Sequence, residues 1–263
     1  MNEMPGKAAI HLILHPMSEF AHDKVVPYRG SVRGKKEQVA EMFDDIAPRY
    51  DFMNRFLSAG IDVSWRKKAL KKLIPLSPKM ILDVATGTAD VALMAAGILK
   101  PARIEGIDIS EGMLELGRKK IERQGLQEMI RLQKGDSEAI AFPDGLFDAV
   151  TVAFGVRNFA DLEKGLAEIH RVLRPGGKIM VLEFSRPAIP GIRQLYDMYT
   201  GMVAPGMGGF FSKNREAYRY LHDSVQQFPE GRTFTDILSR TGFKETICER
   251  LSLGICSIYT GTR

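Results

Sequence analysis

Acidic residues stand at the ends of two neighbouring apolar segments of this 263-residue chain. Asp83 lies near the end of segment 80–84, and Asp108 ends segment 103–108. Both segments have the composition of buried parallel strands, and Gly87 turns the first of them into a helical pattern. Open parallel sheets bind ligands at the carboxyl ends of their strands. We therefore expect both carboxylates at a nucleoside site, with Asp108 accepting hydrogen bonds from the ribose hydroxyls.

The turn after the first segment does not suit a pyrophosphate. Dinucleotide sites use the pattern G-x-G-x-x-G, so that the backbone and the helix dipole can approach the phosphates. Here the three positions are Gly87, Ala89 and Ala92, and Asp90 opens the helix. A carboxylate there repels a pyrophosphate but tolerates the ammonium group of S-adenosylmethionine, which disfavours NAD and FAD. Asp90 also has a simpler interpretation, since an acidic residue stabilises a helix N-terminus.

A third polar pair, Asp136 and Ser137, follows segment 130–134. A carboxylate at this position can accept a hydrogen bond from the exocyclic amine of adenine, and backbone amides can serve the ring nitrogens. An ordinary turn is the alternative interpretation. The position of the pair at a third strand end favours a ligand role.

Alternating strand and helix patterns surround these residues. The segments that predict parallel strands are 80–84, 103–108, 130–134, 147–153 and 178–184. Helical patterns lie at 91–99, 111–124 (with Ser110 as N-cap) and 161–173, the last stopped by a turn signal at 174–177. Segments 244–251 and 255–260 predict an antiparallel hairpin. The predicted fold class is therefore α/β and Rossmann-like, with a seven-stranded, mostly parallel sheet and a C-terminal antiparallel hairpin.

Residues 35–263 are predicted as one domain, preceded by an N-terminal extension, 1–34, that we expect to be poorly ordered. Met17 is a second possible start of the chain, and we expect no signal peptide. Within 35–75, two helices are expected to come before the sheet. The first, 35–57, has a predicted break at Pro48. The second, 61–73, carries a run of basic residues that indicates either a solvated face or contact with anionic lipid headgroups.

An insert at 185–231 interrupts the alternation and is rich in Met, Tyr, Phe, Gly and Pro. Its most apolar stretch runs from residue 196 to residue 211. So long a segment between sheet elements favours a lid or a substrate wall. A helical subdomain that packs its own core is an equally good interpretation.

The composition is that of a globular protein, with 44% hydrophobic and 26% charged residues and a net charge of +5. The basic residues are scattered, so we expect no nucleic-acid partner. Cys248 and Cys256 are too few for a disulfide scaffold, which favours a cytoplasmic protein. The five histidines lack the spacing of metal ligands, and we expect no metal.

Four motifs together resemble the ubiquinone/menaquinone biosynthesis C-methyltransferase family. They are Phe-Asp-Asp-Ile-Ala-Pro-Arg-Tyr-Asp-Phe-Met-Asn at 43–54, Leu-Asp-Val-Ala-Thr-Gly-Thr-Ala-Asp at 82–90, Phe-Gly-Val-Arg-Asn at 154–158 and Leu-Arg-Pro-Gly-Gly at 173–177. Further matches at 218–224, 228–229 and 242–243 extend the resemblance from about residue 37 to the C-terminus. It implies the class I methyltransferase fold and S-adenosylmethionine as cofactor. It also implies cofactor contacts at Thr88, Asp108, Asp136 and Ser137, although Ala89 and Asp136 stand where relatives often carry Gly and Asn.

The implied reaction is methylation of a ring carbon of a polyprenyl quinol. Demethylmenaquinol becoming menaquinol is the expected reaction, and a benzoquinol of ubiquinone biosynthesis is the close alternative. A ring carbon becomes a nucleophile once a hydroxyl loses its proton, so Arg157 is the candidate for stabilising the oxyanion and Asp90 for accepting the proton. A structural ion pair is the alternative role of Arg157. A quinol held in the bilayer further implies docking at the inner face of the membrane.

Other classes of protein stay open. A methyltransferase acting on another small molecule or on tRNA would share this fold, although a tRNA enzyme should show a denser basic stripe. A non-catalytic scaffold is a third class. It is disfavoured because a site without activity would not need the three acceptors Asp83, Thr88 and Asp108 at its strand ends. The sequence does not decide the oligomeric state, and a homodimer is one option.

Overall fold

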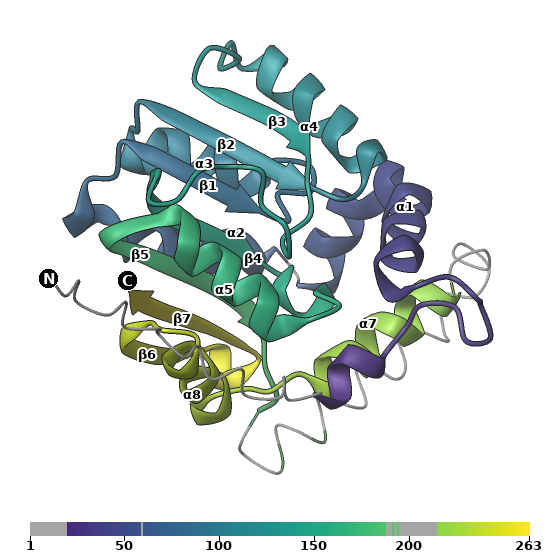
Figure 1. Cartoon of the computed structure of the whole chain (residues 1–263). Helices are drawn as coiled ribbons and strands as arrows, with labels where there is room; N and C mark the ends of the chain where they lie inside the picture. Colours follow the sequence, from purple (N-terminus) through teal and green to yellow (C-terminus); the bar gives the residue numbers. More distant parts are fainter. Residues whose placement is uncertain (1–19, 59, 188–190, 192–193, 195–214) are drawn as a thin grey trace, which may run out of the picture.

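A computed structural model of the chain describes residues 20–58, 60–187, 191, 194 and 215–263. Its centre is a seven-stranded sheet with the strand order β3-β2-β1-β4-β5-β7-β6 (Figure 1). The strands are β1 (Met80–Val84), β2 (Arg103–Asp108), β3 (Ile130–Lys134), β4 (Phe147–Ala153), β5 (Leu173–Phe184), β6 (Lys244–Leu251) and β7 (Cys256–Thr262). The first five are parallel, and β7 pairs antiparallel with both β5 and β6. The predicted fold class is confirmed.

Apolar layers cover both faces of the sheet because successive side chains of a strand point in opposite directions. Leu82 of β1 joins the core cluster beneath α5 (Leu162–Val172) and α8 (Arg232–Arg240). Its neighbour Ile81 joins the cluster beneath α2 (Ile61–Lys71) and α3 (Asp90–Leu99). Two-sided burial explains why the strand segments read as continuous apolar runs rather than as an alternation.

Helix α1 (Lys35–Leu57) lies beside α4 (Glu111–Arg123), and the arrowheads of β2 and β3 point toward it in Figure 1. The helix runs continuously through Pro48, so the predicted break is wrong. Proline removes one backbone hydrogen bond, but tertiary packing can hold such a helix together. Here Ile46 and Ala47 are buried against Met113 of α4. This packing keeps α1 over the carboxyl end of the sheet.

Residues 174–177 fall within the bounds of β5, but its pairing with β4 passes from Leu173 directly to Lys178, so the predicted turn signal follows the end of α5 and precedes the regular part of the strand. The pairing of β4 with β5 shifts its register between Phe147 and Ala149, and Gly176 has a φ of +75°. A glycine at positive φ and a register shift are typical of a bulge. The predicted N-cap is confirmed at Ser110, whose side chain accepts from the Met113 amide.

Residues 20–34 of the predicted N-terminal extension are folded against the domain, unlike our expectation of poor order. They contain the short 3₁₀ helix η1 (Ala21–Lys24). Val25 and Tyr28 pack against α1 and against Tyr220 of α7 (Arg215–Gln227). Their apolar side chains gain burial there, which the weak periodicity of the sequence did not indicate. Residues 1–19 lie outside the described residues.

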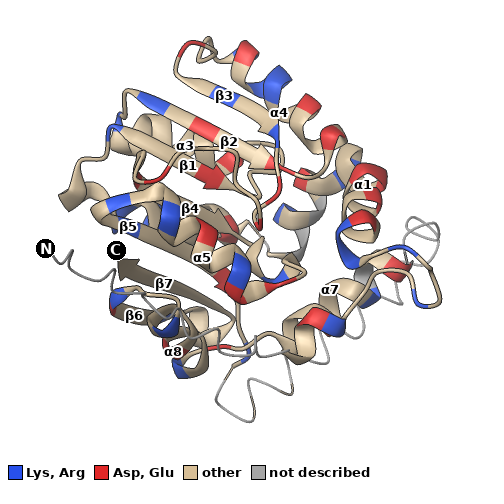
Figure 2. Ribbon diagram, in the orientation of Figure 1, with Lys and Arg blue, Asp and Glu red and all other residues tan. Residues whose placement is uncertain are grey.

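Most of the insert also lies outside the described residues, including the apolar stretch 196–211, so the interpretation of the insert as a lid stays a prediction. No helix within the described ranges is long and apolar enough to cross a membrane. Figure 2 shows Lys and Arg residues spread over several elements, without a continuous stripe among the described residues in this view.

Candidate functional site

A cavity of about 650 Å³, partly open to solvent, lies at the carboxyl ends of β1, β2 and β4. We call it the strand-end cavity. Three predicted residues line it together: Asp108, Asp136 and Ser137. Helix α1 supplies the opposite wall through apolar and aromatic side chains that include Phe43 and Tyr50. The prediction that these strand ends meet at one place is therefore confirmed for three residues.

Asp108 links two loops at the floor of this cavity. Its Oδ2 accepts from the Gly87 amide at 2.8 Å and its Oδ1 accepts from the Ser110 amide at 2.9 Å. Burial raises the pKa of Asp108, and the two amide hydrogen bonds partly oppose that rise. Each carboxylate oxygen can accept more than one hydrogen bond, so both keep capacity for a ligand hydroxyl. The geometry suits a group with two adjacent hydroxyls.

Lys36 of α1 reaches across the mouth of the strand-end cavity. Its Nζ lies 2.6 Å from Asp136 Oδ2 and 2.7 Å from Glu138 Oε2. Sequence reasoning missed Lys36, because the partners are about a hundred residues apart in the chain. A cation beside Asp136 partly neutralises it, which leaves the carboxylate able to accept one further hydrogen bond from a neutral amine.

A second cavity, of about 350 Å³, lies around the loop after β1, and we call it the loop cavity. It shares four lining residues with the strand-end cavity: Tyr50, Ala85, Gly87 and Ala153. Asp83 lies at its floor and accepts from Thr86 Oγ1 at 2.6 Å and from Thr151 Oγ1 at 2.5 Å. Burial raises the pKa of Asp83 to about 6. The shared walls make the two cavities neighbouring parts of one elongated site.

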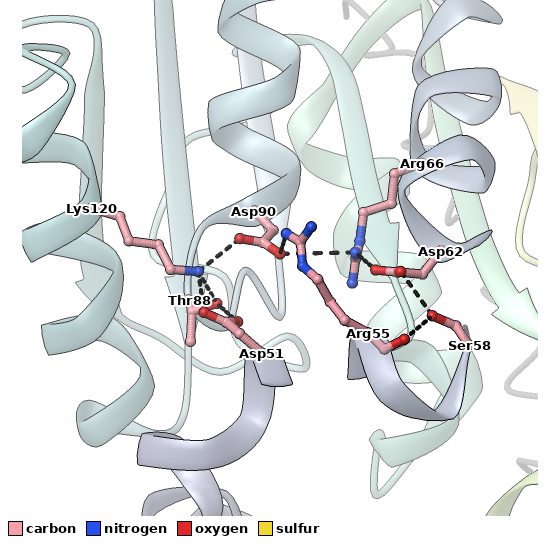
Figure 3. Close-up of polar contacts among 8 residues, drawn as sticks. All are labelled: Asp51, Arg55, Ser58, Asp62, Arg66, Thr88, Asp90 and Lys120. Atoms are coloured by element: carbon pink, nitrogen blue, oxygen red, sulfur yellow. Dashed lines mark hydrogen bonds and ion pairs between the residues drawn. The ribbon is translucent and has the colours of Figure 1, made fainter. Parts of the chain in front are cut away.

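The predicted contact residue Thr88 lines the loop cavity but already has two side-chain partners. Its hydroxyl donates to Asp51 Oδ1 at 2.6 Å and accepts from Lys120 Nζ at 2.8 Å. Figure 3 shows Lys120 between Asp51, Thr88 and Asp90. The Thr88 side chain thus joins α1 and α4 to the loop, and its hydroxyl oxygen keeps one lone pair that can accept from a ligand.

Asp90 also lines the loop cavity and is surrounded by cations (Figure 3). Its carboxylate lies 2.7 Å from Lys120 Nζ, 3.5 Å from Arg55 Nη2 and 3.8 Å from Arg66 Nη1. Arg66 belongs to the run of basic residues for which we expected a solvated face or a lipid contact, yet it is only 5% exposed. The prediction is wrong for this residue, because its position on α2 faces Asp62 and the loop rather than solvent.

A third cavity, of about 470 Å³, is mostly apolar, and we call it the apolar cavity. Its described walls come from α1, α7 and the turn η3 (Val156–Asn158). They consist of Met42, Phe43, Ile46, Tyr50, Asn54, Arg157, Asn158, Ala217, Tyr220 and Leu221. Three of these residues also line the strand-end cavity: Phe43, Tyr50 and Asn158. A flat apolar ligand would therefore lie next to whatever fills the strand-end cavity.

Arg157 is the buried charge of the apolar cavity. Its Nη1 donates to Glu183 Oε1 at 2.6 Å and to the Phe154 carbonyl at 2.7 Å. Its Nε is buried and has no hydrogen-bond partner among the described residues. The ion pair gives Arg157 the structural role that the sequence allowed. The free Nε–H is consistent with a second role toward a ligand.

The two predicted catalytic residues do not meet, since Arg157 lines the apolar cavity and Asp90 the loop cavity. Sequence reasoning also missed the position of Tyr50, which lines all three cavities. Its only signal was its place in the Ala-Pro-Arg-Tyr-Asp motif. One tyrosine at the junction separates the polar parts of the site from the apolar part.

Comparison with known proteins gives a consistent result. Residues 31–263 match the model of the ubiE/COQ5 methyltransferase family. The chain is 45% identical to the demethylmenaquinone methyltransferase of Bacteroides fragilis, over 93% of this chain and 99% of that protein. It is 48% identical to the ubiquinone/menaquinone biosynthesis C-methyltransferase UbiE of Geotalea daltonii, over 87% of this chain and 97% of that protein.

Among solved structures, the fold is similar to a SAM-dependent methyltransferase of Thermotoga maritima described as a possible histamine N-methyltransferase. The TM-score is 0.59 at 20% identity, and the match covers 84% of this chain and 98% of that one. At so low an identity, this similarity concerns the fold alone.

Proposed function

The chain belongs to the ubiE/COQ5 methyltransferase family, and we propose that it methylates a ring carbon of demethylmenaquinol with S-adenosylmethionine as methyl donor. Relatives that match over nearly their whole length carry the name demethylmenaquinone methyltransferase. The observation that carries the proposal is the junction of a polar, elongated site with an apolar cavity that holds a buried arginine.

The strand-end cavity fits the adenosine part of the cofactor. Asp108 would accept from the two ribose hydroxyls, while Asp136 and the Ser137 amide would hold the adenine edge. The carboxylates of Asp83 and Asp90 in the loop cavity suit the ammonium group. When bound, the cofactor supplies an electrophilic methyl group on a sulfonium.

The apolar cavity suits the quinol ring. Met42 and Ile46 supply apolar contact, and Tyr220 donates to Asn158 Oδ1 at 3.0 Å, which holds that amide in place. Arg157 would stabilise the oxyanion of the deprotonated ring through its free Nε–H, a form of electrostatic stabilisation that is strong in a buried site. For Asp90, the geometry supports a role at the ammonium group rather than as proton acceptor, since it lines the other cavity.

The ubiquinone pathway offers a second candidate substrate, a benzoquinol, because some relatives carry both pathway names. The test is incubation with labelled S-adenosylmethionine and reduced demethylmenaquinone, with a reduced benzoquinone and the oxidised quinone in parallel. We expect methylation of demethylmenaquinol only. The oxidised ring is itself an electrophile, so equal rates on quinol and quinone would contradict a carbon nucleophile.

We further propose that the protein is cytoplasmic and works at the inner surface of the membrane, where a polyprenyl quinol resides. Lys67 and Lys71 of α2 are exposed and could contact anionic headgroups. Lys68 and Lys72, in the same basic run, instead pair with Glu249 at 2.7 and 2.5 Å. The basic surface available to lipid is therefore smaller than the sequence alone suggested.

A further inference from the structure

Arg66 is a buried cation at the wall of the loop cavity. It is 5% exposed, and it is the only cation among the described residues that line this cavity. The other charged lining groups are the carboxylates of Asp83 and Asp90. Among the described side chains that line the loop cavity, Arg66 is therefore the one cation with which an anionic group of a ligand could pair.

The guanidinium of Arg66 has at least one N–H donor, at Nε, that is not used within the described part of the chain. Its Nη1 donates to Asp62, four residues earlier on the same helix, and the same atom lies 3.8 Å from Asp90 Oδ2. Its Nε is buried and has no hydrogen-bond partner within the described part of the chain. A guanidinium carries five N–H donors, and a buried donor without a partner is costly. A ligand that accepts at this place would remove that cost.

The neighbours of Arg66 fix the orientation of its guanidinium and leave its Nε–H available to a ligand. Asp62 also accepts from Ser58 Oγ at 2.8 Å, and Asp90 also pairs with Lys120, as Figure 3 shows. The Arg66 guanidinium carbon lies 5.4 Å from the centre of the Phe154 ring, which adds a cation–π contact. Phe154 in turn lines the strand-end cavity. Arg66 is thus preorganised at the boundary between the two polar cavities.

We propose that Arg66 binds the α-carboxylate of the amino-acid moiety of S-adenosylmethionine, an inference that rests on the cofactor assigned above. The adenosine part would be held by Asp108 in the strand-end cavity, and the shared walls lead from there into the loop cavity. The amino-acid moiety carries one ammonium and one carboxylate. The loop cavity offers two carboxylates and one guanidinium, a planar donor that matches a carboxylate in two-pronged fashion.

Calorimetry with three ligands tests this assignment without turnover. S-adenosylhomocysteine keeps both charges of the amino-acid moiety, decarboxylated S-adenosylmethionine keeps only the ammonium, and 5′-methylthioadenosine keeps neither. We expect Arg66→Gln to lower the affinity for S-adenosylhomocysteine about 10- to 150-fold, which is the effect of losing one charge-assisted hydrogen bond. Binding of 5′-methylthioadenosine should stay within about threefold of wild type. Decarboxylated S-adenosylmethionine should bind equally well or more tightly, because a repelling cation is gone.

Arg55→Gln is the matched control. Arg55 also contacts Asp90 and loses the same charge on substitution, but it is exposed and does not line the loop cavity. This variant should bind all three ligands as wild type does. Arg66→Lys should recover part of the affinity for S-adenosylhomocysteine, since a point charge replaces only part of a planar donor.

Unchanged S-adenosylhomocysteine binding in Arg66→Gln would overturn the inference while leaving the cofactor assignment intact. An equal loss for all three ligands would also overturn it, because Arg66 would then only support the fold of the site. Should Arg66→Gln fail to fold, Arg66→Lys takes its place. This variant should also lose affinity for S-adenosylhomocysteine and keep its affinity for 5′-methylthioadenosine, but the loss should be smaller. A wild-type protein that bound none of the three would overturn both this inference and the proposed cofactor.

Discussion

Replacing Arg157 by alanine is expected to leave the buried carboxylate of Glu183 without its ion-pair partner. Glu183 is fully buried, and its Oε1 lies 2.6 Å from Arg157 Nη1. Removing one partner of a buried pair typically costs about 3–5 kcal/mol, because the other charge stays buried and uncompensated. At about 2–4 °C per kcal/mol for a chain of this size, Arg157→Ala should lower the melting temperature by about 6–20 °C at pH 7.5.

The pH dependence of that loss follows from Glu183. Burial already raises its pKa in the wild type, and the Arg157 charge opposes the rise. Without Arg157, the folded-state pKa of Glu183 rises further above the unfolded value of about 4.3. A carboxyl whose folded pKa is raised binds more protons in the folded state, so stability falls as pH increases between the two values. The deficit of Arg157→Ala relative to wild type should therefore shrink as pH is lowered toward about 4.5, measured by urea unfolding.

A double variant separates this structural role from the reaction. Arg157→Gln with Glu183→Gln removes both charges and leaves two amides that can hydrogen-bond, so it should regain most of the lost stability. Its kcat should still be about 10²–10³ lower, the range for losing one oxyanion donor, with little change in S-adenosylmethionine affinity. A stable double variant with normal kcat would return Arg157 to a purely structural role. An Arg157→Ala variant as stable as wild type at pH 7.5 would refute the argument from the buried pair.

Three further expectations concern other parts of the molecule. Asp108→Ala should lower the affinity for S-adenosylmethionine about 10- to 150-fold, measured by calorimetry, because charge-assisted hydrogen bonds to the ribose are lost. A folded variant with unchanged affinity would show that Asp108 is not part of the site. Burial lowers the pKa of His22 to about 3, so the folded state resists its protonation and stability should fall as pH drops below about 6.5. His22→Gln should flatten that slope in urea unfolding between pH 6.5 and 4.5, and an identical slope would show that His22 does not set it. In flotation with anionic liposomes at low salt, Lys67→Glu with Lys71→Glu should reduce the bound fraction, and no wild-type binding would count against membrane docking.

The sequence by itself predicted the sheet and three polar residues of the strand-end cavity, Asp108, Asp136 and Ser137. Strand segments buried on both faces must be continuously apolar, so their pattern could be recognised without any partner in view. The carboxyl ends of parallel strands necessarily share an edge, which is why Asp108 and Asp136 could be placed together across 28 residues of chain. The N-cap at Ser110 was predictable because its side chain accepts from an amide only three residues away, which makes the contact local.

Only the tertiary structure determines the contacts between helices that lie far apart in the sequence. Lys120 of α4 joins Asp51 of α1 to Asp90 of α3, and no local pattern predicts such a meeting. Pro48 remains inside a helix because α4 packs beside it, an energetic contribution absent from the local sequence. Arg66 looked like a member of a solvated basic run, and only the packing of α2 against the loop after β1 turned it into a buried donor. Burial of a charge depends on every element packed around it, whereas local sequence determines only the conformation of its own segment.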